Sequence, residues 1–262
     1  MNHFAKELEA GRAIARQAGE IALRYYRNGI TFESKSDHSP VTRADRECEQ
    51  FIATELDRVF PEDGLLGEEG ARKESRNGRR WIVDPIDGTR DFVRGSPTWA
   101  VLIALEADGE VVAGFAHLAA LGELFSAARG GGAYVNGQRI HASAVARIPE
   151  AVLCFDSFNT AGVQTFSAQL LDWMRPFWAV RSMGGALDAM MVARGEADIW
   201  IETGGKPWDF APLKIIAEEA GACFFDFAGQ ATIYGGNCVV CAPGLEQTVR
   251  AFVSRPGEPA GS

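Results

Sequence analysis

The chain has 262 residues and a formal net charge of −9, from 26 lysines and arginines against 35 aspartates and glutamates. This acidity, with no basic cluster to offset it, argues against non-specific binding to nucleic acid. Hydrophobic residues make up 47% of the sequence, which is ordinary for a globular protein with a buried core. No apolar run approaches the roughly 20 residues that cross a bilayer. We therefore expect neither a nucleic-acid partner nor a membrane partner.

Five cysteines are spread through the sequence, and this odd number fits reduced thiols in a reducing compartment. Cys238 and Cys241 form a C-x-x-C, a spacing found in redox and zinc sites. Their setting, NCVVCAPG, is an apolar, strand-like run without a second pair or a nearby His, so we interpret both as buried structural thiols. The N-terminus is charged throughout and has no apolar signal-peptide segment. These features predict a cytoplasmic protein.

Two helices are predicted at the start of the chain. Residues 4–27 carry apolar side chains at helical spacing, and Asn28-Gly29 provides a C-terminal stop. A second helix is expected from near Thr42 to Pro61, with Thr42 and Asp45 as an N-terminal cap pair.

From residue 81 the apolar period changes to that of strands. The runs WIVD, WAVLIALEADGEVVAGFAHL and LFSAARGGGAYVNGQRIH contain two hairpin turns, at Asp108-Gly109 and Asn136-Gly137. They predict a largely antiparallel sheet that the first two helices flank. Together these elements form an expected N-terminal α+β subdomain at residues 1–146.

Beyond about residue 146, short apolar strands alternate with helical stretches. The predicted strands are AVLCF, ADIWI, ACFFDF and CVVCA, and the predicted helices are QTFSAQLLDWM, GALDAMMVARG, FAPLKIIAEEAG and LEQTVRAFV. This alternation is typical of α/β organisation. We therefore predict an α/β fold in which residues 147–262 form a C-terminal α/β subdomain.

The stretch WIVDPIDGT brings two aspartates to the end of a buried strand. Trp81-Ile82-Val83 delivers Asp84, and Pro85 holds it extended without adding an N–H that needs a partner. Asp87 follows three residues on, so a turn can place both carboxylates and the Ile86 carbonyl on one side. Such hard oxygen ligands favour Mg²⁺ or Mn²⁺. A plain Asp-Pro/Asp-Gly turn after a strand is the simpler alternative.

Two further acidic sites favour the metal hypothesis over a plain turn. LLGEEG places Glu68 and Glu69 after an apolar pair, at the end of another predicted strand. KPWDFAP sets Asp209 at the start of an apolar helix, where an N-cap is its alternative role. Zinc is a poor fit, since none of the four histidines pairs at ligand spacing.

The motifs GEE, DPIDGT and WDFAPLKIIAEEAGA, in this order and spacing, resemble those of the inositol monophosphatase family of metal-dependent phosphatases. The likeness covers nearly the whole chain and implies a layered αβαβα sandwich of the inositol monophosphatase and sugar phosphatase type. It implies that the metal ligands are Glu68, Asp84, the Ile86 carbonyl, Asp87 and Asp209. Most of these lie in the first subdomain, and Asp209 comes from the second with the substrate pocket.

The same likeness implies a catalytic set and a mechanism. Asp45 and Thr89 match the pair that orients the attacking water, with Glu68 as the third catalytic residue. Two carboxylate-sized charges about 4 Å apart interact by roughly 4 kcal/mol at an effective dielectric near 20, so only bound cations would let this site accept a phosphate. We expect two or three Mg²⁺ ions, with Mn²⁺ as a substitute, and direct attack of a metal-activated water without a phosphoenzyme.

Substrate contacts also follow from the resemblance. Gly88 and Thr89 would offer backbone N–H groups to the phosphate, which Asp209 would flank. Glu202 stands where the family has an acid that contacts substrate hydroxyls, with a solvated strand end as its alternative. The segment RSMGGA matches a stretch that lines the pocket, with Arg181, Gly185 and Ala186 as the residues concerned. Lys35 is a loose match to a lysine that many members carry.

The sequence after DPIDGT bears on the choice of substrate. Its VRG-x-P-x-W-x-x-LIAL pattern is similar to bacterial histidinol-phosphate phosphatases of the family, enzymes of histidine biosynthesis. Asp91 departs from the asparagine or serine common there, and its carboxylate could receive a cationic amine. The alternatives are an inositol-1-phosphate phosphatase, a nucleotide or sulfur-assimilation bisphosphatase, and a non-catalytic metal- or phosphate-binding module. The likeness further implies a homodimer that lithium inhibits.

Overall fold

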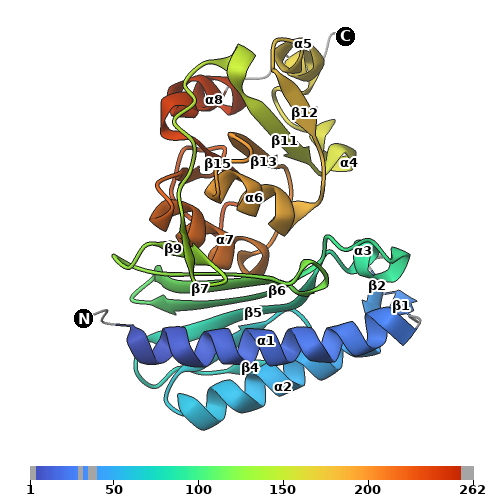
Figure 1. Ribbon diagram of the computed structural model, residues 1–262, viewed down its shortest axis with the longest axis vertical. Helices are drawn as coiled ribbons and strands as arrows, with labels where there is room; N and C mark the ends of the chain where they lie inside the picture. Colours follow the sequence, from blue (N-terminus) through green and yellow to red (C-terminus); the bar gives the residue numbers. More distant parts are fainter. Residues whose placement is uncertain (1–3, 29–31, 35–39, 255–262) are drawn as a thin grey trace.

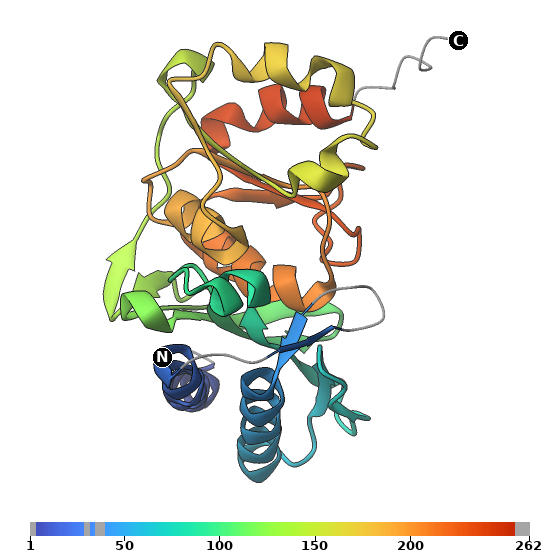
Figure 2. The same cartoon turned by 90° about the vertical axis from the view of Figure 1, so that its right-hand side faces the viewer.

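Alternating layers of helices and sheets build the protein. Over residues 4–28, 32–34 and 40–254, which the computed structural model describes, the chain forms an eight-stranded sheet, a five-stranded sheet and a two-stranded hairpin. Helices α1 and α2 cover one face of the eight-stranded sheet, α6 and α7 lie between the two large sheets, and α5 and α8 cover the far side (Figures 1 and 2). The predicted αβαβα sandwich is confirmed.

The first two helices have the predicted positions. Helix α1 spans Ala5–Asn28 and α2 spans Arg43–Val59, with the hairpin strands β1 (Phe32–Ser34) and β2 (Pro40–Thr42) between them. Thr42 is the N-cap of α2, and its side chain accepts hydrogen bonds from the N–H groups of Ala44 and Asp45. The Asp45 carboxylate in turn accepts from the Thr42 N–H, which completes the predicted cap pair.

The eight-stranded sheet has the order β10-β9-β8-β7-β6-β5-β3-β4, and every pair except β3–β5 is antiparallel. Asp108, Gly109, Asn136 and Gly137 all have positive φ, as the predicted tight hairpin turns require. The strands are β3 (Gly64–Gly67), β4 (Arg72–Lys73), β5 (Arg79–Asp87), β6 (Ala100–Ala107), β7 (Glu110–Leu118), β8 (Glu123–Ala128), β9 (Ala133–Val135) and β10 (Gln138–Ile140).

The five-stranded sheet is mixed and has the order β12-β11-β13-β15-β14. β11 runs parallel to both of its neighbours, whereas β15 is antiparallel to β13 and β14. Its strands are β11 (Val152–Asp156), β12 (Ala179–Arg181), β13 (Ile199–Glu202), β14 (Cys223–Phe225) and β15 (Cys238–Cys241). Cys238 and Cys241 are fully buried free thiols, as the sequence predicted.

The helices after β5 are shorter than the first two. They are α3 (Thr89–Arg94), α4 (Phe158–Ala161), α5 (Leu170–Met174), α6 (Gly185–Ala193), α7 (Pro207–Glu219) and α8 (Glu246–Val253). The helix predicted over QTFSAQLLDWM is only one 3₁₀ turn followed by α5, and Leu171 on it is exposed. None of the described helices is long and apolar enough to cross a membrane.

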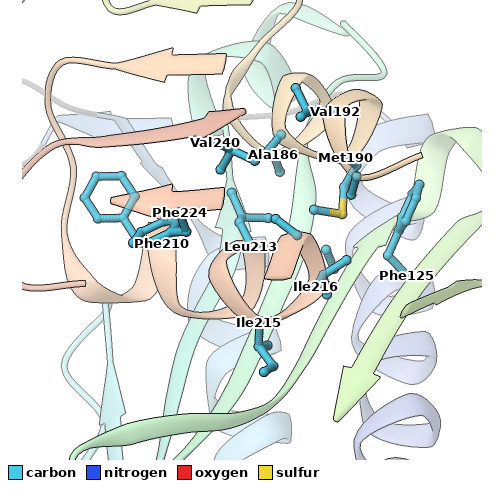
Figure 3. Close-up of a cluster of buried hydrophobic side chains, with 14 of the residues drawn as sticks. Phe125, Ala186, Met190, Val192, Phe210, Leu213, Ile215, Ile216, Phe224 and Val240 are labelled. Atoms are coloured by element: carbon cyan, nitrogen blue, oxygen red, sulfur yellow. The ribbon is translucent and has the colours of Figure 1, made fainter. Parts of the chain in front are cut away.

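One apolar core joins the two large sheets. Met190 of α6 and Leu213 and Ile216 of α7 lie between them, packed with Phe125 of β8 and Val240 of β15 (Figure 3). The predicted subdomain boundary near residue 146 falls between β10 and β11, and this core spans it. Residues at the ends of strands from both sheets are therefore held in fixed relation to each other.

Candidate metal and substrate site

A cavity of about 440 Å³ lies where strand ends of both sheets meet the starts of α3, α6 and α7. Carboxylates dominate its wall. Those that line it are Glu68, Asp84, Asp87, Asp91, Asp156, Glu202 and Asp209. Six of the seven were candidate site residues from sequence, and Asp156 was not.

A bulge in β5 explains why Asp84 and Asp87 face the same side. On β5 Asp87 is three positions after Asp84, but their partners on β6, Leu102 and Ala100, are only two positions apart. The extra residue cancels the alternation that would turn the two carboxylates to opposite faces. The Ile86 N–H donates to Asp84 Oδ1 at 2.9 Å, and the buried Ile86 side chain anchors the turn in the core.

Asp84, Asp87 and Asp209 form the centre of the acidic group. One carboxylate oxygen from each lies within 4.8 Å of the others. Burial raises the pKa of Asp84 well above its ordinary value, and the charges of Glu68, Asp87 and Asp209 raise it further. Burial and then Asp209 raise the pKa of Asp87 in the same way, and burial raises the pKa of Asp209 to about 6. Such mutually repelling oxygen donors fit a divalent cation.

Asp209 reaches this group from the first turn of α7. Pro207 begins the helix, and Asp209 is its third residue, so the alternative role as N-cap is wrong. Its Oδ2 instead accepts from the Lys206 N–H at 2.6 Å, as the third residue of a capping box does. This bond fixes the carboxylate at the helix start, where it faces Asp84 and Asp87.

The Asp45–Thr89 pair stands beside the acidic group. Thr89 Oγ1 lies 3.2 Å from the Ile86 carbonyl oxygen and 3.5 Å from Asp45 Oδ1. The hydroxyl can therefore donate a hydrogen bond to either oxygen. Asp45 is fully buried, and burial raises its pKa. Its other oxygen accepts from Thr42, so one carboxylate caps α2 and contacts Thr89 at the same time.

Most of the predicted substrate residues line the cavity. Gly88, Thr89, Asp91, Gly185, Ala186, Glu202 and Asp209 all do so. Gly88 has φ +78, a left-handed conformation that lets the backbone turn toward the acidic group. The Ala186 N–H donates to Asp87 Oδ2 at 3.2 Å, which links the start of α6 to β5.

Glu202 lines the cavity but is buried, whereas Arg181 does not line the cavity. Glu202 is buried rather than solvated: it is 7% exposed, accepts from the Gly204 N–H at 3.0 Å, and burial raises its pKa to about 7. Arg181 ends the edge strand β12 with an exposed side chain that donates to the Val180 carbonyl, and it does not line the cavity. Lys35 lies outside the described residues.

Sequence reasoning missed Asp156 and Trp200. Asp156 ends the apolar strand AVLCFD just as Asp84 ends WIVD, so the signal used for Asp84 could also have found it. Trp200 lies within the apolar strand ADIWIE, where nothing distinguishes it from an ordinary core residue.

Comparison with known proteins places the chain in a family. A model described as "Inositol monophosphatase family" matches residues 5–255. The chain belongs to the inositol monophosphatase family. A histidinol-phosphatase of Chlorobaculum parvum is 40% identical over 90% of this chain and 92% of its own. An inositol-1-monophosphatase of Mesorhizobium japonicum is 34% identical over 95% of this chain and 93% of its own.

Solved structures agree with this family assignment. The crystal structure of the extragenic suppressor protein suhB from Bartonella henselae has a TM-score of 0.90 and 30% identity. It covers 96% of this chain and 99% of its own. Together the matches identify the chain as a phosphoric monoester hydrolase of a metal-dependent family.

Proposed function

We propose that this inositol monophosphatase family member is a Mg²⁺-dependent histidinol-phosphate phosphatase of histidine biosynthesis. The observation that carries the hydrolase chemistry is the acidic group of Asp84, Asp87 and Asp209, with ligand oxygens within 4.8 Å, next to the Asp45–Thr89 pair. The substrate assignment is supported by the relatives that carry the name histidinol-phosphatase, at 40% and 38% identity. The position of Asp91 on the cavity wall supports it further.

Each part of the site has a role in this proposal. Glu68, Asp84, the Ile86 carbonyl, Asp87 and Asp209 hold two or three Mg²⁺ ions. Bound there, Mg²⁺ offsets the negative charge of the phosphate oxygens and makes water a better nucleophile. The Thr89 hydroxyl orients the attacking water, takes the water's proton and passes its own proton to Asp45, with Glu68 beside it.

Groups from both subdomains hold the substrate in this proposal. The Gly88 and Thr89 N–H groups bind the phosphate oxygens, and the left-handed turn at Gly88 supports this contact. Asp91 binds the amine of histidinol, while Gly185, Ala186, Glu202 and Asp209 border the rest of the substrate. Arg181 also contributes to binding in this hypothesis, although its exposed side chain gives the proposal no support.

Phosphate release from histidinol phosphate tests the proposal directly. Turnover is expected with Mg²⁺ and is lost when a chelator removes it; hydrolysis that survives chelation would contradict the metal assignment. Direct attack by water inverts the configuration at a chirally labelled phosphorus, whereas retention would reveal a phosphoenzyme. An unchanged KM for histidinol phosphate in the Asp91→Asn variant would contradict the proposed contact between Asp91 and the substrate amine.

Inositol-1-phosphate is the second candidate substrate. Two observations favour it: Glu202 is buried on the cavity wall, and a relative named inositol-1-monophosphatase is 34% identical. A higher kcat/KM for inositol phosphate than for histidinol phosphate would establish this alternative. The non-catalytic module has no such support, because every predicted ligand and catalytic residue is present.

The remaining proposals concern assembly and location. A homodimer is supported by exposed apolar side chains on α5 and on both sides of the edge strand β12, namely Leu171, Trp178 and Met183. A particle mass of twice the chain mass, measured by light scattering, would agree with a homodimer.

Inhibition by lithium, Mn²⁺ as a substitute for Mg²⁺ and a cytoplasmic location are proposed from the family resemblance. The five free thiols fit the cytoplasmic location.

A further inference from the structure

Two carboxylates of the cavity stand apart from the proposed metal ligands and face a turn without side chains. Gly184 and Gly185 form this turn at the start of α6. A Cβ on Gly184 would lie 3.4 Å from Asp91 Oδ2, and one on Gly185 would lie 4.0 Å from Asp156 Oδ2. Asp91 and Asp156 therefore border the same open stretch of the cavity, one from α3 and one from the end of β11.

The two carboxylates are close enough to affect each other. Burial raises the pKa of Asp91, and the charge of Asp156 raises it further. Asp156 Oδ1 accepts from the adjacent Ser157 N–H at 2.8 Å, which fixes the carboxylate at the end of β11. The pair is thus held in place by separate elements rather than by a flexible loop.

Cations bound at the proposed metal ligands do not balance all the negative charge of the cavity. Two divalent ions would neutralise Glu68, Asp84, Asp87 and Asp209, and the phosphate then adds negative charge. Asp91 and Asp156 remain, together with Glu202, which carries only part of a charge because burial raises its pKa to about 7. Among the described residues that line the cavity, Arg90 carries the only basic side chain, and it is exposed. With two such ions, positive charge on the group that enters beside the phosphate is therefore favourable.

We propose that Asp91 and Asp156 together bind a primary ammonium group of the substrate and make the enzyme selective for aminoalkyl phosphates. The inference rests on the proposed phosphatase function and adds Asp156 as a specificity-determining residue. A primary ammonium has three donors and no acceptor, so it can bond to both carboxylates at once. The turn at Gly184–Gly185 leaves the space that it needs.

A pair of small substrates isolates the ammonium group. 2-Aminoethyl phosphate and 2-hydroxyethyl phosphate are nearly equal in size and differ only in ammonium against hydroxyl. With Mg²⁺ present, wild-type enzyme is expected to favour the amino substrate in kcat/KM. Asp156→Asn and Asp91→Asn should each reduce this preference about 10- to 100-fold, as expected for loss of a hydrogen bond to a charged group. The double variant should lose little more, because both carboxylates bind one group.

Control variants separate the possible failures. Asp172→Asn, an exposed change on α5, should leave both rates unchanged, and circular dichroism checks that each variant folds. A preference that Asp156→Asn leaves intact, or a wild-type enzyme that does not prefer the amino substrate, overturns the inference. An equal loss on both substrates that extra Mg²⁺ restores also overturns it, in favour of another cation site. If no phosphate ester is hydrolysed with Mg²⁺, the proposed function itself fails.

Discussion

The two sides of the cavity are built in different ways. On the side of the eight-stranded sheet, Asp84, Ile86, Asp87 and Thr89 come from one short segment, which a bulge folds onto itself. On the side of the five-stranded sheet, Asp156, Glu202 and Asp209 come from the ends of two strands and the start of a helix. In the proposed assignment, three of the five metal ligands thus come from one compact segment, and Asp209 joins them from the other side. The proposed substrate contacts are spread over separate elements, so each can change independently of the others.

The largest effect is expected from disrupting the compact segment at Asp84. Asp84→Asn should lower kcat/KM about 10⁴-fold or more, because it removes a central ligand of the proposed metal site. The metal-free variant should also be more stable than the wild type at pH 8, since one of several repelling buried carboxylates is gone.

Phosphate release measured with Mg²⁺ gives the effect on kcat/KM. Urea unfolding in a chelator gives the effect on the stability of the metal-free protein. Asp172→Asn serves as the control for loss of a carboxylate, because its side chain is 81% exposed and does not line the cavity. A variant that keeps wild-type activity would show that Asp84 holds no essential metal.

A smaller effect on the same side is expected at Thr89. Thr89→Ala should lower kcat about 10²- to 10³-fold with a nearly constant KM, because the hydroxyl orients the water rather than the bound ester. Thr89→Ser should recover most of the activity. Thr54→Ala on the exposed face of α2 is the matched control, since it also removes a hydroxyl bonded to a backbone carbonyl. A rise in KM alone would contradict the assignment.

The smallest of the three effects concerns the other side of the cavity, at Asp188. This fully buried carboxylate accepts from the Met183 N–H at 3.0 Å and the Gly184 N–H at 3.3 Å, and so holds the turn before α6. Burial raises its pKa from an ordinary value of 3.8 to about 6. Between these two pH values the folded state keeps a proton that the unfolded state has released. Its contribution to stability is therefore present below pH 4 and is lost as the pH rises through 6.

Asp188→Asn removes this pH dependence. Relative to the wild type, the free energy of unfolding of the variant should gain up to about 3 kcal/mol between pH 4 and pH 8. Urea unfolding at both pH values in a chelator measures it, with Asp172→Asn as the reference. An equal difference at both pH values would mean that Asp188 keeps its charge in the folded state.

Sequence reasoning succeeded where the signal was local. The aspartates of DPIDGT, the cap pair Thr42–Asp45 and the hairpin turns all depend on residues within a few positions of one another. It was less successful where contacts from distant segments decide the outcome. The burial of Glu202 depends on how strands of the second sheet meet α6 and α7, and no short pattern records that.

The capping box of α2 couples folding of a helix end to the alignment of a reactive hydroxyl. Asp45 can hold Thr89 only while its other oxygen stays bonded to the backbone of Thr42. Fraying of that first turn would release the carboxylate from its position without disturbing the acidic residues of the metal group. Substitutions at the junction between β2 and α2 should therefore behave as losses of turnover, even though none of them touches the ester.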